Sequence, residues 1–144
     1  MSPITSSVAI GIVGAACRLP GASNESELVS LLADGVCAIT TAPRDRWDVA
    51  RYLHPAQNVP GFSYTFAGGF LKAPFAFDPT VFGLSPRESE QMDPQQRLLL
   101  EVVWEALENA RIAPSSLARE EVGVYVGASS LDHGNVHTPD LASL

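Results

Sequence analysis

The chain has 144 residues, of which 46% are hydrophobic and 17% are charged, and its formal net charge is −7. This composition suits a globular domain, or a large part of one, and excludes an intrinsically disordered chain. The acidic balance argues against nucleic acid and anionic membranes as partners, because both attract basic surfaces. No apolar stretch approaches the roughly 20 residues that span a bilayer, and the first residues lack the basic start of a signal peptide. We therefore expect a cytoplasmic protein.

The N-terminal third predicts a strand followed by a helix. The β-branched run Val8–Gly14 is typical of a buried strand. Asn24 followed by Glu27 is a helix-capping pattern. The asparagine side chain accepts a hydrogen bond from a backbone amide of the first turn, and the glutamate side chain accepts one from a backbone amide at the cap. Leucines then give one apolar face, and Gly35 is a typical helix stop.

Turn-forming residues dominate from Thr41 to Pro60, which predicts an ordered surface excursion around three residues, Arg46, Trp47 and Asp48. The segment Ala67–Leu71 is short and extended, and its two glycines indicate close backbone packing. The aromatic residues that follow predict a core cluster of Phe75, Phe77 and Phe82.

Three sites in the next part of the chain combine a capping side chain with a proline at the first helical position: Asp78-Pro79, Ser85-Pro86 and Asp93-Pro94. The third opens the strongest helical pattern, which runs to Arg111, where a cation suits the last turn. Apolar residues lie nearly all round this helix, so we expect it to be buried on most sides. Val122–Gly127 predicts a second buried strand. The order of elements predicts an α/β fold in which helices cover a sheet.

Five segments in this order resemble the N-terminal half of β-ketoacyl synthase (ketosynthase) domains. They cover about residues 8–130 and resemble large type I polyketide synthases, modular or iterative, more than stand-alone fatty-acid enzymes. The segments are Ile12–Gly21 (with Cys-Arg-Leu-Pro-Gly), Pro43–Asp48, Gly68–Leu71 followed by Phe77–Pro79 and Phe82–Glu88, Met92–Glu108 (with Asp-Pro-Gln-Gln-Arg) and Gly123–Gly127.

The resemblance implies the N-terminal half of a thiolase-like fold, which is α/β with layered sheets and helices, and a homodimer. It also implies an acyltransferase activity of polyketide or fatty acid biosynthesis. In this family an acyl group on a cysteine condenses with a malonyl-type unit, with loss of carbon dioxide. That unit is carried on the phosphopantetheine arm of an acyl carrier protein.

The family cysteine lies in an Asp-Thr-Ala-Cys-Ser-Ser-type segment, which the 144 residues do not contain. The two histidines that assist it in the family lie further along the domain, so we expect them to be absent as well. The resemblance therefore assigns no catalytic, cofactor-binding or metal-binding residue here, and we expect the chain to be inactive alone. We interpret residues 1–144 as a single domain fragment with a core at about 8–130 and an irregular tail at 131–144. Its partner would be the remainder of the ketosynthase. The alternative is a natural truncated protein that binds a full-length ketosynthase or an acyl carrier protein without catalysis.

The cysteines and histidines are weak candidates for chemistry. Cys17 and Cys37 lack Cys-x-x-Cys spacing, so we expect reduced thiols rather than a disulfide or zinc site. We expect Cys17 to be structural and Cys37 to be a small buried residue. His54 is expected at the surface. His133 and His137 have helical spacing for a metal pair, but the glycine between them and Pro139 argue against a helix.

Charged residues of the long helix have structural interpretations. Asp93 is expected to cap the helix, and Arg97 to anchor it to a loop or carboxylate. Glu101, Glu105 and Glu108 could form acid–base pairs, but a solvated helix face is the better prediction. Trp47 is expected to pack on the domain rather than border a substrate entrance or a subunit contact. The glycines form neither a dinucleotide-binding pattern nor a P-loop.

Overall fold

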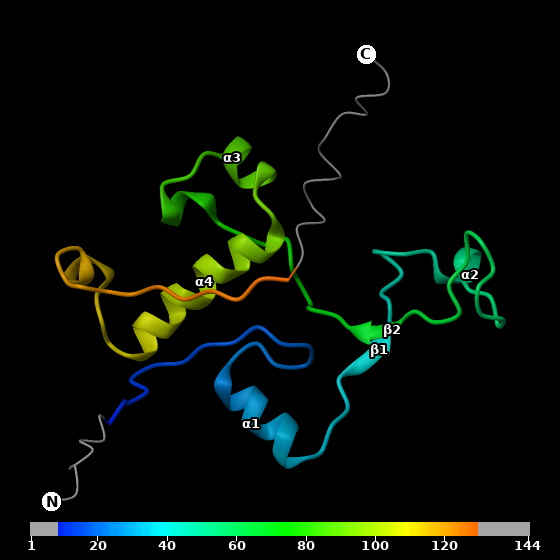
Figure 1. Cartoon of the computed structure of the whole chain (residues 1–144), viewed down its shortest axis with the longest axis horizontal. Helices are drawn as coiled ribbons and strands as arrows, with labels where there is room; N and C mark the ends of the chain where they lie inside the picture. The colour runs from blue at the N-terminus through cyan, green and yellow to red at the C-terminus, as the bar shows by residue number, and fades with distance from the viewer. Residues whose placement is uncertain (1–8, 130–144) are drawn as a thin grey trace, which may run out of the picture.

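The computed structural model describes residues 9–129 of the chain. In the order of the chain its elements are α1 (Glu25–Ala33), β1 (Ile39–Thr41), α2 (Val49–Tyr52), β2 (Ala67–Gly69), the 3₁₀ turn η1 (Pro79–Phe82), α3 (Pro86–Gln91), α4 (Pro94–Asn109) and the 3₁₀ turn η2 (Pro114–Leu117). In Figure 1 α4 lies near the centre with α3 above it, and α2 stands apart. The turn η1 contacts α4 through the rings of Phe82 and Trp104. The mixture of helices with a small sheet is that of a partial α/β fold.

The sheet consists of β1 and β2, which pair antiparallel in the register Ile39↔Gly69 and Thr41↔Ala67. The extended segment predicted around the two glycines is therefore confirmed. A Cβ atom on Gly69 would lie 2.6 Å from the ring of Pro20. Glycine at this position lets the strand approach the loop before α1, which is the close packing that the sequence indicates.

The two strands predicted at Val8–Gly14 and Val122–Gly127 are wrong for this chain. Val8 lies outside the described residues; the rest of both segments is extended, but neither pairs with another strand within residues 9–129. Their side chains are open to solvent, with Ile12 91% and Tyr125 96% exposed. A β-branched run becomes a buried strand only where neighbouring strands and covering helices are supplied. The described residues do not supply them.

Capping side chains begin the helices where the sequence predicts. Asn24 accepts a hydrogen bond from the Glu27 amide at 2.9 Å, and the Glu27 carboxylate accepts one from the Ser23 amide at 2.8 Å. Ser85 and Glu88 form a complete capping box at the start of α3. Asp78 caps η1 by accepting from both the amide and the hydroxyl of the residue two positions on. Local sequence chemistry thus determines these boundaries without help from tertiary packing.

Helix α4 begins as predicted, because Asp93 accepts a hydrogen bond from the Gln95 amide at 2.9 Å. Its end differs from the prediction. Arg111 lies outside the last turn, in the left-handed region with φ of 57°. The amide of Arg111 donates to the carbonyl of Glu108, and that of Ile112 donates to the carbonyl of Leu107, both at 2.9 Å. These two bonds close a Schellman motif, with arginine in the position that glycine usually takes.

The predicted burial of α4 on most sides is also wrong for this chain. No residue of α4 is fully buried, and Leu99 and Val103 are exposed. Contacts are concentrated on two faces of the helix. On one, Phe82 meets Trp104 edge to face and stacks on Phe77, with ring centroids 5.9 Å and 5.2 Å apart. Phe75, predicted to join this cluster, is mostly exposed.

The other contact face of α4 carries the N-terminal segment. Gly14 lies so close to it that a Cβ would meet the Ala106 carbonyl and come within 2.7 Å of the Ala110 methyl group. The amide of Ala15 donates to the Asn109 side chain at 3.2 Å. The extended chain therefore lies directly on the C-terminal half of the helix.

Candidate functional site

The most connected polar group in residues 9–129 is Arg18, at the start of the loop that leads into α1. Its guanidinium donates to both carboxylate oxygens of Glu105, at 2.7 Å from Nη1 to Oε2 and in a shorter bond from Nη2 to Oε1. Nη1 also donates to the carbonyls of Ser23, at 2.7 Å, and Cys17, at 3.1 Å. One side chain thus connects both ends of the loop to the middle of α4.

The bidentate geometry is that of a strong, directional ion pair. The hydrogen bonds to Glu105 are the largest cause that raises the pKa of Arg18, so the arginine is cationic at any working pH. Glu101, one turn earlier on α4, lies beside the pair. Desolvation raises the pKa of Glu101, and the neighbouring Glu105 adds to the effect while Arg18 opposes it. This part of α4 therefore carries two carboxylates that share one arginine.

Two hollows flank this ion pair. One, of about 280 Å³, is lined by Arg18, Ser23, Lys72 and Glu101 together with leucines, alanines and a glycine. The other, of about 530 Å³, lies between the N-terminal half of α4 and the extended segment at residues 126–128. Both are open, and the second is mainly apolar. They are gaps between loosely packed segments rather than shaped substrate pockets.

The predicted solvated face is wrong for Glu101 and Glu105 and holds for Glu108. Glu105 binds Arg18 and Glu101 is partly buried beside it, whereas Glu108 is exposed and accepts a hydrogen bond from the Trp104 indole at 2.9 Å. The part of the face at Glu105 packs against the N-terminal loop. Sequence reasoning missed the ion pair because its partners are 87 positions apart, and such a separation leaves no local pattern.

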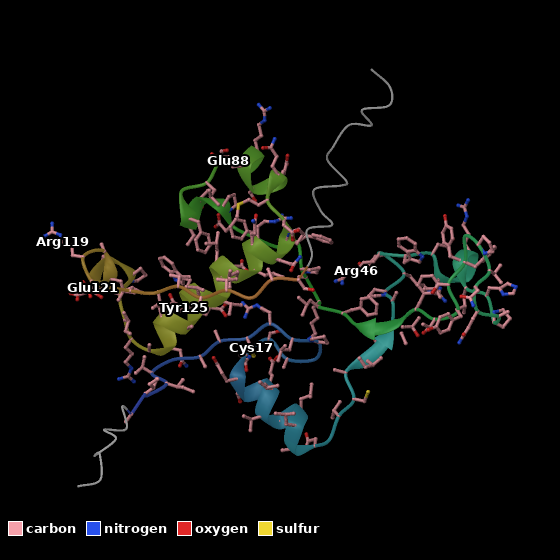
Figure 2. All side chains as sticks on the ribbon, in the orientation of Figure 1. Cys17, Arg46, Glu88, Arg119, Glu121 and Tyr125 are labelled. Carbon is pink, nitrogen blue, oxygen red and sulfur yellow. The ribbon has the colours of Figure 1, made fainter. Side chains whose placement is uncertain are left out.

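Neither cysteine has the surroundings of a nucleophile, which needs an adjacent base. Both thiols are free, in line with the sequence prediction. Cys17 is half-buried in the loop below α4 (Figure 2). Cys37 is exposed, so its predicted burial is wrong; it follows α1 in a stretch that the described residues leave uncovered.

The histidines are not brought together in a described site. His54 is half-buried, where a surface position was predicted: its ring lies 5.7 Å from that of Phe62, and its Nδ1 accepts from the Ala56 amide at 3.1 Å. His133 and His137 lie outside the described residues. Within residues 9–129 no group of three histidine, cysteine, aspartate or glutamate residues could hold a metal ion. No helix in that range has the length and apolar character needed to cross a membrane.

Arg97 does not make the contact predicted for it. Its Nε is buried and has no hydrogen-bond partner among the described residues, whereas a bond to a loop or carboxylate was expected. Arg46 makes such an anchor instead. Its guanidinium donates to the carbonyls of Leu71 and, at 3.3 Å, Lys72, and it points away from α2 toward the rest of the chain (Figure 2). Asp48 caps α2 through the Arg51 amide at 3.3 Å.

Trp47 was predicted to pack on the body of the domain, and this is wrong: its ring contacts aromatic residues of its own segment. Its ring lies 5.7 Å from that of Tyr52 and 6.2 Å from that of Phe66. Half of the tryptophan surface stays exposed. The segment around it is therefore ordered by aromatic contacts, as an ordered excursion requires.

A comparison with protein families identifies the architecture. The sequence model described as "Beta-ketoacyl synthase, N-terminal domain" matches residues 7–143. The chain belongs to this family. The resemblance read from the five segments is confirmed, and with it the recognition of a ketosynthase of the modular polyketide synthase type.

Relatives of known name are large polyketide synthases. Erythronolide synthase EryA2 of Saccharopolyspora erythraea is 49% identical over 127 residues, which are 87% of this chain and 4% of the synthase. A mycocerosic acid synthase-like polyketide synthase of Mycolicibacterium smegmatis is 43% identical over 128 residues, which are 88% of this chain and 6% of that protein. The ketosynthase chain thus spans only a small share of these relatives.

Solved ketosynthases share the fold. The ketosynthase from module 6 of the bacillaene synthase of Bacillus subtilis is 35% identical, with a TM-score of 0.75 over 86% of this chain and 20% of its own. An oxazolomycin ketosynthase domain from Streptomyces albus is 37% identical, with a TM-score of 0.70 over 75% of this chain and 19% of its own. The predicted fold class, a partial thiolase-like α/β fold, is confirmed.

Proposed function

We propose that this chain acts as the N-terminal part of a polyketide synthase ketosynthase. In the complete domain, an acyl group held as a thioester on a cysteine would condense with a malonyl-type unit on an acyl carrier protein. The malonyl carboxylate leaves as carbon dioxide, and the carbanion so formed attacks the thioester carbonyl and displaces the cysteine thiolate. The observation that supports the proposal most is the family match in register over residues 7–143.

The described residues support a structural part in that activity. Cys17, Cys37 and His54 lie in three different segments and form no nucleophile–base pair. We propose that the cysteine and histidines of the condensation belong to the remainder of the ketosynthase. The Arg18–Glu105 ion pair and the contact of Gly14 with α4 would hold the frame on which that remainder folds.

The partners follow from the same proposal. They are the remainder of the ketosynthase, a second ketosynthase in a homodimer, and an acyl carrier protein that brings the phosphopantetheine arm. This segment itself would bind no cofactor. Both cysteines are free, which fits a reducing compartment, and we propose a cytoplasmic location.

A chimera tests the proposal. Residues 7–143 of this chain would replace the matching segment of the EryA2 ketosynthase, which is 49% identical over the shared region. The chimera, the unaltered ketosynthase and the 144-residue chain alone would each be incubated with an acyl thioester. Intact-protein mass spectrometry then measures covalent acyl loading. We expect loading of the first two proteins and none of the chain alone.

Two outcomes would overturn the proposal. A folded, dimeric chimera that fails to load would mean that these residues do not support ketosynthase chemistry. Acyl loading of the chain alone, lost on Cys17→Ala or Cys37→Ala, would mean that it carries a nucleophile of its own.

A further inference from the structure

Arg97, near the start of α4, is a cation whose charge is not answered within residues 9–129. Its Nε is buried and has no hydrogen-bond partner there. Asp93 and Glu101 lie four positions before and after it, at the spacing that lets opposite charges pair on a helix. Yet the one ion pair among the described residues joins Arg18 and Glu105. The carboxylates of the helix itself therefore do not serve as the partner of Arg97.

The position of Arg97 makes this lack of a partner costly. A buried donor without an acceptor loses the hydrogen bonds that it makes in water. Arg97 is also the fourth residue of α4, close to the helix end whose free N–H groups already carry positive charge and disfavour a cation. Buried donors without acceptors are rare in complete folds. We therefore expect the acceptor for Arg97 to lie outside residues 9–129.

The other half-buried arginines of the chain show what such a side chain does here. Among the described residues, Arg18, Arg46 and Arg97 are half-buried and the remaining arginines are exposed. Arg18 bonds to a carboxylate 87 positions away, and Arg46 bonds to a backbone carbonyl 25 positions away. Both connect segments that are distant in the sequence. Arg97 is the third member of this set, and its distant segment is the one that is missing.

The course of the chain indicates where that segment lies. Residues 126–128 line the same hollow as Gln95 and Gln96 at the start of α4, so the described part of the chain ends beside this end of the helix. The matched region makes up 19% and 20% of the two solved ketosynthases, which leaves about four-fifths of each outside it. The N-terminal end of α4 thus lies at the border with the remainder of the domain.

We propose that Arg97 anchors α4 to a carboxylate in the part of the ketosynthase that follows residue 144. A carboxylate accepts from Nε and a terminal nitrogen of the guanidinium together, which is the two-bond geometry that arginine favours. It also supplies the negative charge that the start of α4 lacks, which a backbone carbonyl does not. This inference rests on the proposed function, because it takes the acceptor from the remainder of a ketosynthase.

The test compares one substitution in two settings, the 144-residue chain and the EryA2 chimera that carries residues 7–143. Arg97→Met keeps an unbranched apolar side chain and removes the charge and the donors. Hydrogen–deuterium exchange of the α4 amides measures local stability. In the chain alone we expect exchange to be unchanged or slower, because a buried donor without a partner is removed. In the chimera we expect exchange about tenfold faster or more, because the carboxylate is left buried and unpaired.

Arg18→Met is the matched control. It makes the same change at an arginine whose partner, Glu105, lies within the described residues. It should therefore speed exchange of residues 15–23 in both settings. Faster α4 exchange of Arg97→Met in the chain alone would overturn the proposal, because the acceptor would then lie within the 144 residues. Unchanged α4 exchange of that variant in the chimera would also overturn it, because the remainder would then hold no acceptor.

Charge reversal tests whether the acceptor is a carboxylate. In the chimera, Arg97→Glu should speed α4 exchange, and changing one acidic residue of the remainder to arginine should restore it. If none of the acidic residues, changed one at a time, restores slow exchange, the acceptor is not a carboxylate. Acyl loading of the same chimeras separates the two proposals. Loading with no effect of Arg97→Met on exchange contradicts the anchor alone, whereas the expected exchange pattern without loading contradicts the condensation alone.

Discussion

Replacing Glu105 by glutamine removes the charge that Arg18 binds, while side-chain volume is kept. Arg18 then loses a bidentate carboxylate and retains its bonds to the carbonyls of Ser23 and Cys17. A hydrogen bond to a charged group contributes about 1.5–3 kcal/mol in a shielded site, and an exposed ion pair about 0.2–1 kcal/mol. The side chains of Arg18 and Glu105 are 26% and 39% exposed, so the contribution lies between these ranges, at about 1–2 kcal/mol.

The structure also shows where that loss should be felt. Few apolar contacts hold the N-terminal loop on α4, and Ala22 is its one buried hydrophobic residue among those described. Without the ion pair, the loop should open locally before α4 unfolds. Hydrogen–deuterium exchange measures this opening directly. We expect amides of residues 15–23 in Glu105→Gln to exchange about 5–30 times faster than in the unaltered chain, the ratio that corresponds to about 1–2 kcal/mol.

Glu108→Gln is the matched control for this experiment. Glu108 lies on the same helix and accepts from Trp104, but it does not bind Arg18. Its substitution should leave exchange of residues 15–23 unchanged. Equal exchange rates of residues 15–23 in Glu105→Gln and Glu108→Gln would show that the ion pair does not hold the loop. So would exchange rates of the unaltered chain that high salt leaves unchanged.

Three further predictions concern α4. Asp93→Ala should cost about 1 kcal/mol of helix stability because it removes the N-cap, whereas Asp93→Asn should cost much less. Equal urea midpoints for the alanine and asparagine variants would rule out capping. Arg111→Gly should stabilise the chain by up to about 1 kcal/mol, because glycine takes the left-handed conformation without a Cβ penalty; a lower thermal midpoint would contradict this. Burial raises the folded pKa of Glu101, so its ionisation opposes folding in full at pH values above the folded pKa; the opposition shrinks as pH falls below the folded pKa and is gone below the unfolded pKa. Glu101→Gln should therefore match or exceed the unaltered chain in stability at pH 7 and lose that advantage in mild acid; clear destabilisation at pH 7 would show that attraction to Arg18 prevails.

Local chemistry made the helix starts predictable. Asn24, Ser85 and Asp93 each carry a side chain that satisfies backbone donors within three residues, so no distant contact is needed to place them. The β2 segment was predictable because its glycines indicated close backbone packing, and Gly69 does permit the approach of Pro20. The end of α4 was less predictable, since an arginine occupies the position where a glycine would have signalled the Schellman motif.

The remaining differences have one physical cause, which is that burial depends on neighbours. The runs around Ile12 and Val124 have the composition of buried strands, yet no strand among residues 9–129 pairs with them. Glu105 reads as a solvated helix residue until the N-terminal loop brings Arg18 onto it. Pairing over such sequence distances is set by the whole fold, so it could be anticipated only through the family resemblance.

The intact mass of the native protein in its source cell tests the central claim most directly. Material captured with an antibody against residues 43–66 would be measured by mass spectrometry, and the sequence printed here accounts for 15.3 kDa. A mass far above that value is predicted, since the chain would then be one part of a synthase whose ketosynthase performs the condensation. A native mass near 15.3 kDa would contradict the account and leave a non-catalytic binding protein in its place.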